Sequence, residues 1–331
     1  MERKLLTNIT FTKNRPLQLD GYLRSLHRFF PSEWMQMFVI YKEELFDGEY
    51  ESVFRQFPDI EVIRESSFHR DTLAVLDRVD TEYVLFGIDD VAFFDGLPWE
   101  LVEKTFAEAG DDIFGFTLRF GPETVRQDGD AIDEVLIGNE TVYRLRWANG
   151  QTKHTRYPFE LCSTVYRTCL VRDIVQRTMS SSALAKRLFS PDSGLVRAWS
   201  RVVSPRSLLK KFGFFYSPNT FESWVCRWCQ THSDELPGFT YFQKVCATAI
   251  QVNMVNTSTR NAHWGTDEHT VEALNERYKE GYRLDIDFVG AGEKPGSGSG
   301  PEVFRLVRAA GRETHDGADG GEPAKDRGLP A

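Results

Sequence analysis

The stretch "EYVLFGIDDVAFF" (residues 82–94) places two adjacent carboxylates, Asp89 and Asp90, after a continuous apolar run. A strand that is apolar on both faces is typical of a parallel α/β sheet covered by helices on both sides. In such sheets, ligands bind outside the carboxyl ends of the strands. Neighbouring carboxylates resist ionisation together unless a cation offsets their charge, and a divalent ion with oxygen ligands would do so. The stretch therefore predicts a ligand site, with an acidic turn exposed to solvent as the open alternative.

The first 120 residues alternate between apolar runs and segments with helical spacing of apolar residues. This pattern is typical of βαβ units and predicts a mostly parallel, doubly wound sheet of the α/β class. The expected strands are 4–12, 35–42, 60–65, 82–88 and 112–120, and the expected helices are 17–30, 69–80 and 97–109.

The remainder of the chain has a mixed character. We expect a hairpin around "ANG" (148–150), a helix that begins in "SPNTFESW" with Asn219 as N-cap, a strand at 247–255 and a helix at 266–281. From residue 291 the sequence is rich in Gly, Pro, Ser and charge, which predicts a disordered tail over 291–331. The prediction is one domain, 1–290, made of a half at 1–120 and a half at 121–290.

Composition restricts the function further. The net charge of −9 argues against nonspecific binding to nucleic acid. The sequence shows no secretory leader and no run of about 18 apolar residues, so a cytoplasmic protein is expected. The five cysteines, including Cys226 and Cys229 in "CRWC", are expected to be reduced thiols. The basic, amphipathic segment 181–211 fits peripheral contact with the inner face of a membrane, and a solvated insertion fits equally well.

Two stretches carry a family resemblance. "TKNRPLQLDGYLRSL" after the first strand, and "EYVLFGIDDVAFF" with its acidic pair, resemble the opening loop and the DXD region of GT-A nucleotide-sugar glycosyltransferases of the family 2 type. "YPFELCSTVYRTCLV" and "SPNTFESW" resemble the acceptor half of the bacterial members. Here the first DXD position is Ile88, and no base-contacting acid is evident in "FVIYKEE" after the second strand.

The resemblance implies roles for particular residues. Asp90 and His263 would bind Mn²⁺ or Mg²⁺, and Glu222 would be the catalytic base, with Glu160 as a second candidate. Each role has an alternative: His263 as a surface residue, and Glu222 as the N3 member of a capping box begun by Asn219. Residues expected at the nucleotide sugar are Thr12, Asn14, Arg15, Arg70, Asp89 and Arg260.

The predicted function is metal-dependent transfer of a sugar from a nucleoside diphosphate sugar to a hydroxyl of a glycan or glycolipid, with inversion. A nucleotidyltransferase is an alternative, but "TFTKNRP" lacks the glycines that a triphosphate loop needs. A non-catalytic α/β module that binds a nucleotide or sugar is the other alternative. Its acidic pair would be structural.

Overall fold

A nine-stranded sheet forms the centre of the molecule in this computed structural model, which describes residues 4–30, 32–46, 48–179, 214–255, 265–291 and 298–309. Across the sheet the strands are β3 (Ile60–Arg64), β2 (Met35–Lys42), β1 (Leu6–Lys13), β4 (Tyr83–Ile88), β9 (Thr164–Arg167), β6 (Ile113–Thr117), β10 (Phe239–Phe242), β8 (Glu140–Arg146) and β7 (Asp133–Ile137). The first four strands are parallel. Strand β9 runs antiparallel to both of its neighbours, and the hairpin β7–β8 closes the far edge. The predicted α/β class is confirmed, with a parallel N-terminal half and a mixed C-terminal half.

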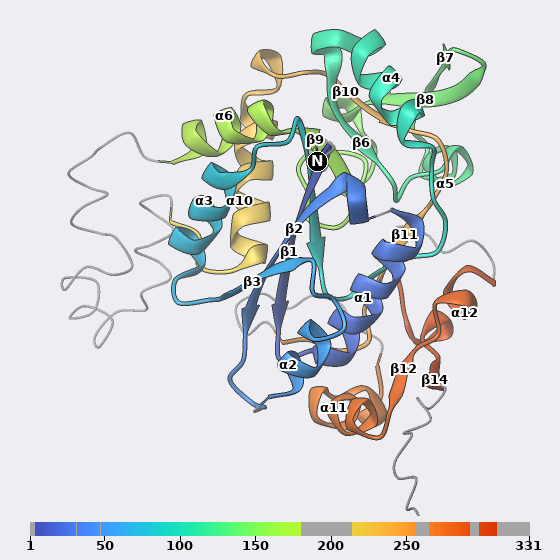
Figure 1. The fold of residues 1–331 in the computed structure, drawn as a ribbon. Helices are drawn as coiled ribbons and strands as arrows, with labels where there is room; N and C mark the ends of the chain where they lie inside the picture. Colours follow the sequence, from blue (N-terminus) through green and yellow to red (C-terminus); the bar gives the residue numbers. More distant parts are fainter. Residues whose placement is uncertain are drawn as a thin grey trace, which may run out of the picture.

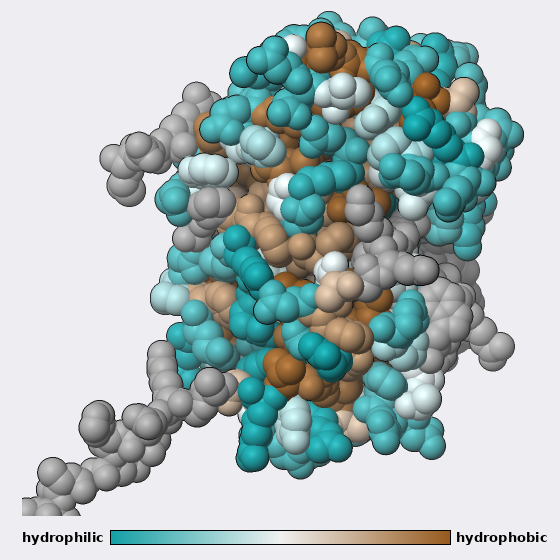
Figure 2. Space-filling view, turned by 90° about the vertical axis from the view of Figure 1, so that its right-hand side faces the viewer, coloured by the Kyte–Doolittle hydropathy of each residue, from teal (hydrophilic) through white to brown (hydrophobic). Residues whose placement is uncertain are grey.

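Helices cover both faces of the sheet (Figure 1). On one face lie α1 (Pro16–Phe29), α2 (Glu49–Phe54), α4 (Trp99–Ala109) and α11 (Val271–Lys279), and on the other lie α3 (Phe68–Arg78), α6 (Thr168–Thr178) and α10 (Pro218–Thr231). Two short helices, α5 (Pro122–Gln127) and α12 (Ile286–Ala291), complete the set among the described residues. Alternate residues of the strands feed the two apolar cores, which is why the strands read as continuous apolar runs. The outer surface in Figure 2 is mostly hydrophilic, with apolar residues showing between the polar ones near the middle of that face.

Helix α1 packs against β4 through a contact that only glycine permits. Tyr22 lies over Gly87, and a Cβ at residue 87 would meet the Tyr22 hydroxyl oxygen at 2.0 Å. That hydroxyl accepts a hydrogen bond from Asn8 Nδ2 (2.8 Å), and the same Asn8 amide donates to the carbonyl of Leu85 (3.1 Å). The helix is thereby held close to the strand that ends in the acidic pair.

A small second sheet begins directly after that pair. Strand β5 (Val91–Phe93) runs antiparallel to β11 (Ala247–Ile250), which also pairs with β13 (Gly298–Ser299). The backbone N–H of Ile250 donates to the carbonyl of Asp90 (2.6 Å). The acidic pair is therefore the turn that joins two sheets.

The structure corrects three expectations. The hairpin is β7–β8, turning at Gly138 with φ +60°, while residues 147–149 form a 3-10 turn rather than a hairpin loop. The N-cap of helix α10 is Ser217 instead of Asn219. The expected tail from residue 291 contains described, paired structure, because β13 joins β11 and β14 (Leu306–Arg308) joins β12 (Tyr282–Leu284). The predicted domain end at 290 is therefore too early for residues 298–309.

Of the other expectations, some are met by the structure and one concerns residues that the structure does not describe. All five cysteines are free thiols, as predicted. No helix in the described part of the chain has the length and apolar character to cross a membrane. The basic segment 181–211 lies outside the described residues.

We predict that G87A destabilises the protein while G238A does not. At residue 87 a methyl group would force Tyr22 away from the strand, at a cost of about 3 kcal/mol in the free energy of unfolding. At residue 238 the nearest atom to a new Cβ lies 3.9 Å away, which is an ordinary contact. Denaturant unfolding of the two variants checks this, and equal midpoints would contradict the packing described.

Candidate functional site

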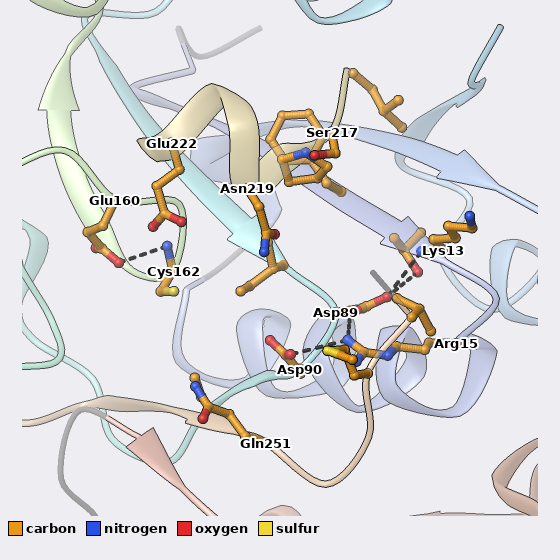
Figure 3. Close-up of a pocket in the computed structure, with 18 of the residues that line it drawn as sticks. Lys13, Arg15, Asp89, Asp90, Glu160, Cys162, Ser217, Asn219, Glu222 and Gln251 are labelled. Carbon is orange, nitrogen blue, oxygen red and sulfur yellow. Dashed lines mark hydrogen bonds and ion pairs between the residues drawn. The ribbon is translucent and has the colours of Figure 1, made fainter. Parts of the chain in front are cut away.

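A cavity of about 510 Å³ lies at the carboxyl ends of β1 and β4. The side formed by the ends of β1 and β4, called the β1–β4 wall below, carries Thr12, Arg15, Asp89 and Asp90. Glu160 and Glu222 lie on the opposite side (Figure 3). The structure thus brings together six of the residues singled out from the sequence.

Asp89 is buried and its two oxygens are fully engaged. Oδ1 accepts from Arg15 Nη1 (2.8 Å), while Oδ2 accepts from the Thr12 hydroxyl (2.8 Å) and from the Lys13 backbone N–H (3.2 Å). The whole residue is 4% exposed. Asp89 therefore ties the β1 loop to the end of β4.

Asp90 is differently placed. Its Oδ2 accepts from Arg15 Nη1 (3.1 Å), whereas its buried Oδ1 has no hydrogen-bond partner among the described residues. Burial raises the pKa of Asp90, and the nearby Arg15 guanidinium opposes that rise. An unpartnered buried carboxylate oxygen that borders a cavity is suited to bind a cation or a donor hydrogen.

The cation that offsets the acidic pair in this structure is Arg15. Its Nη1 contacts both carboxylates, and its Nη2 donates to the carbonyl of Asn253 (2.6 Å). Although burial works to lower it, the pKa of Arg15 is raised, because Asp89 and Asp90 outweigh burial. An internal guanidinium is thus one cation that offsets the pair, and the expected divalent ion at Asp90 stays a prediction.

Glu222 lies on the first turns of α10. Ser217 is the N-cap and its hydroxyl accepts from Thr220 N–H, so Thr220 and not Glu222 is the N3 member of the capping box. The capping role considered for Glu222 is therefore wrong. Its Oε1 accepts from the Leu161 backbone N–H (3.2 Å). Burial, followed by the neighbouring Glu160, raises the pKa of Glu222 to about 7.

Glu160, in contrast, is firmly held. Its Oε1 accepts from Ser163 N–H (3.0 Å) and its Oε2 from Cys162 N–H (2.8 Å), and the residue is 3% exposed. Arg119 Nε lies 3.5 Å from Oε2. Glu160 is well placed to brace the loop before β9, and Glu222 is left as the better candidate for proton transfer.

Glu160, Cys162 and Glu222 offer three potential metal-ligand atoms within 4.8 Å of one another. Two features disfavour a cation there. The Arg119 guanidinium already lies beside Glu160, and burial raises the pKa of the Cys162 thiol well above its ordinary value. The thiolate that a metal would need is therefore costly to form.

Two predicted residues lie away from the cavity. Asn14 has φ +53°, and its Oδ1 accepts from the backbone N–H groups of Glu44 (2.8 Å) and Leu45 (3.3 Å). Arg70 has an exposed side chain that donates to Ser66 Oγ (2.6 Å). Neither is among the residues that line the cavity. Arg260 and His263 lie outside the described residues.

Several cavity residues were missed by the sequence reasoning. The missed residues include Lys13, Lys42, Glu65, Arg119, Lys153 and Tyr157. Lys13 and Lys42 end β1 and β2, and Glu65 follows β3, so the rule of strand carboxyl ends could have found them. Lys153 has no comparable signal, because it lies in a loop remote from the parallel strands.

Comparison with known proteins gives a limited match. No family model matches the chain. It is 25% identical over 185 residues to the bifunctional glycosyltransferase pgtA of Dictyostelium discoideum, a match that covers 48% of this chain and 23% of that protein. The predicted resemblance to glycosyltransferases is therefore supported by sequence, over less than a quarter of the relative's length.

Solved structures of TarS from S. aureus are also similar. One covers 51% of this chain and 29% of that chain at 17% identity and a TM-score of 0.37. TarS 1–349 in complex with UDP covers 51% and 48%, at 18% identity and a TM-score of 0.35. At these TM-scores the likeness carries no argument about function.

We expect R15Q to lower the free energy of unfolding by about 3 kcal/mol at neutral pH, because it leaves two buried carboxylates without their shared cation. R70Q is the matched control and should change it by less than about 0.5 kcal/mol, since Arg70 is exposed. Chemical denaturation measures both. Equal losses would show that the ion pair does not support the fold.

Glu222 should also make stability depend on pH. Its pKa is raised from an ordinary 4.5 to about 7, so within this window the folded protein holds a proton that the unfolded chain releases. The contribution of Glu222 to stability is therefore present below pH 4.5 and is lost as pH rises through 7. E222Q should gain stability relative to the wild type between pH 4.5 and 8, by roughly 2 kcal/mol, and the exposed-site variant E108Q should not.

Proposed function

We propose that the protein is a glycosyltransferase that moves a sugar from a nucleoside diphosphate sugar to a hydroxyl group. The observation that carries the proposal is one cavity with Arg15 and Asp90 on one side and Glu222, a carboxyl group with a pKa of about 7, on the other. The sequence match to a named glycosyltransferase supports the same reaction class.

The sugar donor would lie along the β1–β4 wall. Lys13 and Lys42 line the cavity beside Thr12 and Arg15. The positive charges of the two lysines and of Arg15 suit the diphosphate. The position at the carboxyl ends of β1 and β2 is where parallel sheets bind nucleotides. Arg15 in particular could turn one of its N–H groups toward a phosphate oxygen while it keeps its bond to Asp89.

A divalent ion, Mn²⁺ or Mg²⁺, fits this wall at one point. Asp90 Oδ1 is the buried oxygen without a described partner, and it would be the direct ligand. When bound there, the ion would stabilise negative charge on the leaving diphosphate. His263 as a further ligand remains a proposal from the sequence.

On the opposite side, Glu222 would accept the proton of the acceptor hydroxyl. A base works best when its pKa is near the working pH, and burial brings the pKa of Glu222 to about 7. Attack by a hydroxyl from this side, opposite the diphosphate, would invert the anomeric centre. The acceptor would be a glycan or a lipid-linked sugar.

One observation favours a second candidate, a non-catalytic module that binds a nucleotide or sugar. Arg15 already neutralises both carboxylates, so the acidic pair is stable without any ligand. Such a module would bind nucleotide sugars but release no nucleotide from them. Turnover separates the two candidates.

The test is release of nucleotide from UDP-, GDP-, dTDP- and CMP-sugars, with Mn²⁺ and with EDTA. We expect one donor class to be consumed, and D90N and E222Q each to lower kcat by about 100-fold or more. D77N, at an exposed position on α3, is the control and should retain full activity. E222Q should leave donor binding unchanged, because Glu222 is assigned to the acceptor side.

Three results would contradict parts of the proposal. Binding without turnover for every donor would favour the non-catalytic module. Full activity in EDTA, together with normal activity of the D90N variant, would contradict the proposed metal. Equal loss of donor binding and turnover in E222Q would contradict the proposed role of Glu222 as base.

A further inference from the structure

The acceptor side of the cavity carries positive charge that the reaction just proposed does not use. Arg119 follows β6, Lys153 lies in the loop before β9, and both line the cavity. We propose, on the basis of the proposed function, that the acceptor carries an anionic group, a carboxylate or a phosphate, which binds between Arg119 and Lys153 while its hydroxyl faces Glu222.

Arg119 is a buried guanidinium with unused hydrogen-bonding capacity. The residue is 7% exposed, and its Nε has no hydrogen-bond partner among the described residues. Its Nη2 makes one long bond, 3.4 Å, to the carbonyl of His154. Because a guanidinium has five N–H donors, a buried one with so few bonds is prepared to receive an acceptor group.

The simplest alternative is that Arg119 serves only as the counter-ion of Glu160. The geometry argues against this. Glu160 takes its hydrogen bonds from the backbone of Cys162 and Ser163, at 2.8 and 3.0 Å. Arg119 Nε lies 3.5 Å from the same carboxylate, which is an ion pair without a hydrogen bond. Glu160 therefore anchors Arg119 without saturating it.

Lys153 supplies the second charge. It is exposed, and no ion pair engages its ammonium within the described part of the chain. Burial lowers the pKa of His154, and the charges of Arg119 and Lys153 lower it further, so both cations act on the same residue of the loop. A buried guanidinium with an exposed ammonium beside it suits a carboxylate or phosphate better than a neutral sugar.

The anionic group would lie near the proposed base. Arg119 is close enough to Glu222 to oppose the rise in its pKa. Glu160 is near both, because its Oε2 lies 3.5 Å from Arg119 Nε and it offers a potential ligand atom within 4.8 Å of one from Glu222. An acceptor held by its charge at Arg119 would therefore present a neighbouring hydroxyl to Glu222. Such positioning makes attack on the donor effectively intramolecular.

The test measures binding by calorimetry with two matched pairs: p-nitrophenyl β-glucuronide against the β-glucoside, and glucose 6-phosphate against glucose. We expect at least one charged member to bind about tenfold more tightly than its neutral partner. K153Q should reduce that preference about fivefold and R119Q should abolish it, whereas K104Q, an exposed lysine on α4, should retain it.

Each outcome decides the matter. Preference for the glucuronide alone identifies a carboxylate, and preference for the sugar phosphate alone identifies a phosphate. Equal binding of charged and neutral members by the wild type would overturn the inference, as would a full preference in K153Q, which should fold normally even if R119Q does not. The binding measurement requires no turnover, so it is independent of the activity test. If the protein transfers a sugar but shows no preference for charged ligands, only this inference is contradicted. If it shows the preference but transfers no sugar, only the proposed function is contradicted.

Discussion

The contact of one buried guanidinium with two neighbouring carboxylates holds the site together. Arg15 comes from the loop after β1, Asp89 and Asp90 directly follow β4, and Asn253, whose carbonyl accepts from Arg15, follows β11. These partners are separated by 74 to 238 residues in the chain. A single side chain therefore holds the carboxyl ends of β1 and β4 in the large sheet against the segment that follows β11 in the small sheet. The cavity lies at this junction.

Four of the five acids that line the cavity, Asp89, Asp90, Glu160 and Glu222, differ in how many hydrogen-bond donors they receive, and this difference separates their roles. Asp89 accepts three hydrogen bonds and Glu160 two from the backbone, so both are structural anchors. Asp90 keeps one oxygen without a described partner, and Glu222 accepts one bond from Leu161. The proposed function assigns its chemistry to the two carboxylates that the fold satisfies least, in agreement with the rule that a buried polar group without a partner is costly and is retained for a reason.

Much of the N-terminal half could be predicted from the sequence, because its strands are buried on both faces. Strand β2 agrees with the predicted run 35–42 at both ends. Local signals misled where two neighbouring residues could serve the same purpose. Ser217 and Asn219 are both good N-caps, and Pro218 at the first helical position decides for Ser217. The "GN" dipeptide at 138–139 was the true hairpin signal, and "ANG" was not.

The remaining errors concern contacts between distant segments. Strand β14 pairs with β12, and composition alone cannot show that a charged segment finds such a partner. Arg15 was expected to hold the nucleotide. Its role as counter-ion of the acidic pair was missed, because it depends on a contact with a residue 74 positions away in the sequence. Lys153 lines the cavity because of the path that its loop follows, which local sequence signals do not predict.

The pairing of β5 with β11 has a consequence for the order in which the protein assembles during its synthesis. Some 150 residues are translated after β5 before its partner at Ala247–Ile250 leaves the ribosome. Until then, the acidic turn has only its N-terminal contacts, and β4 presents an open edge until β9 arrives. The nascent N-terminal half therefore has an incomplete sheet until these later strands are made.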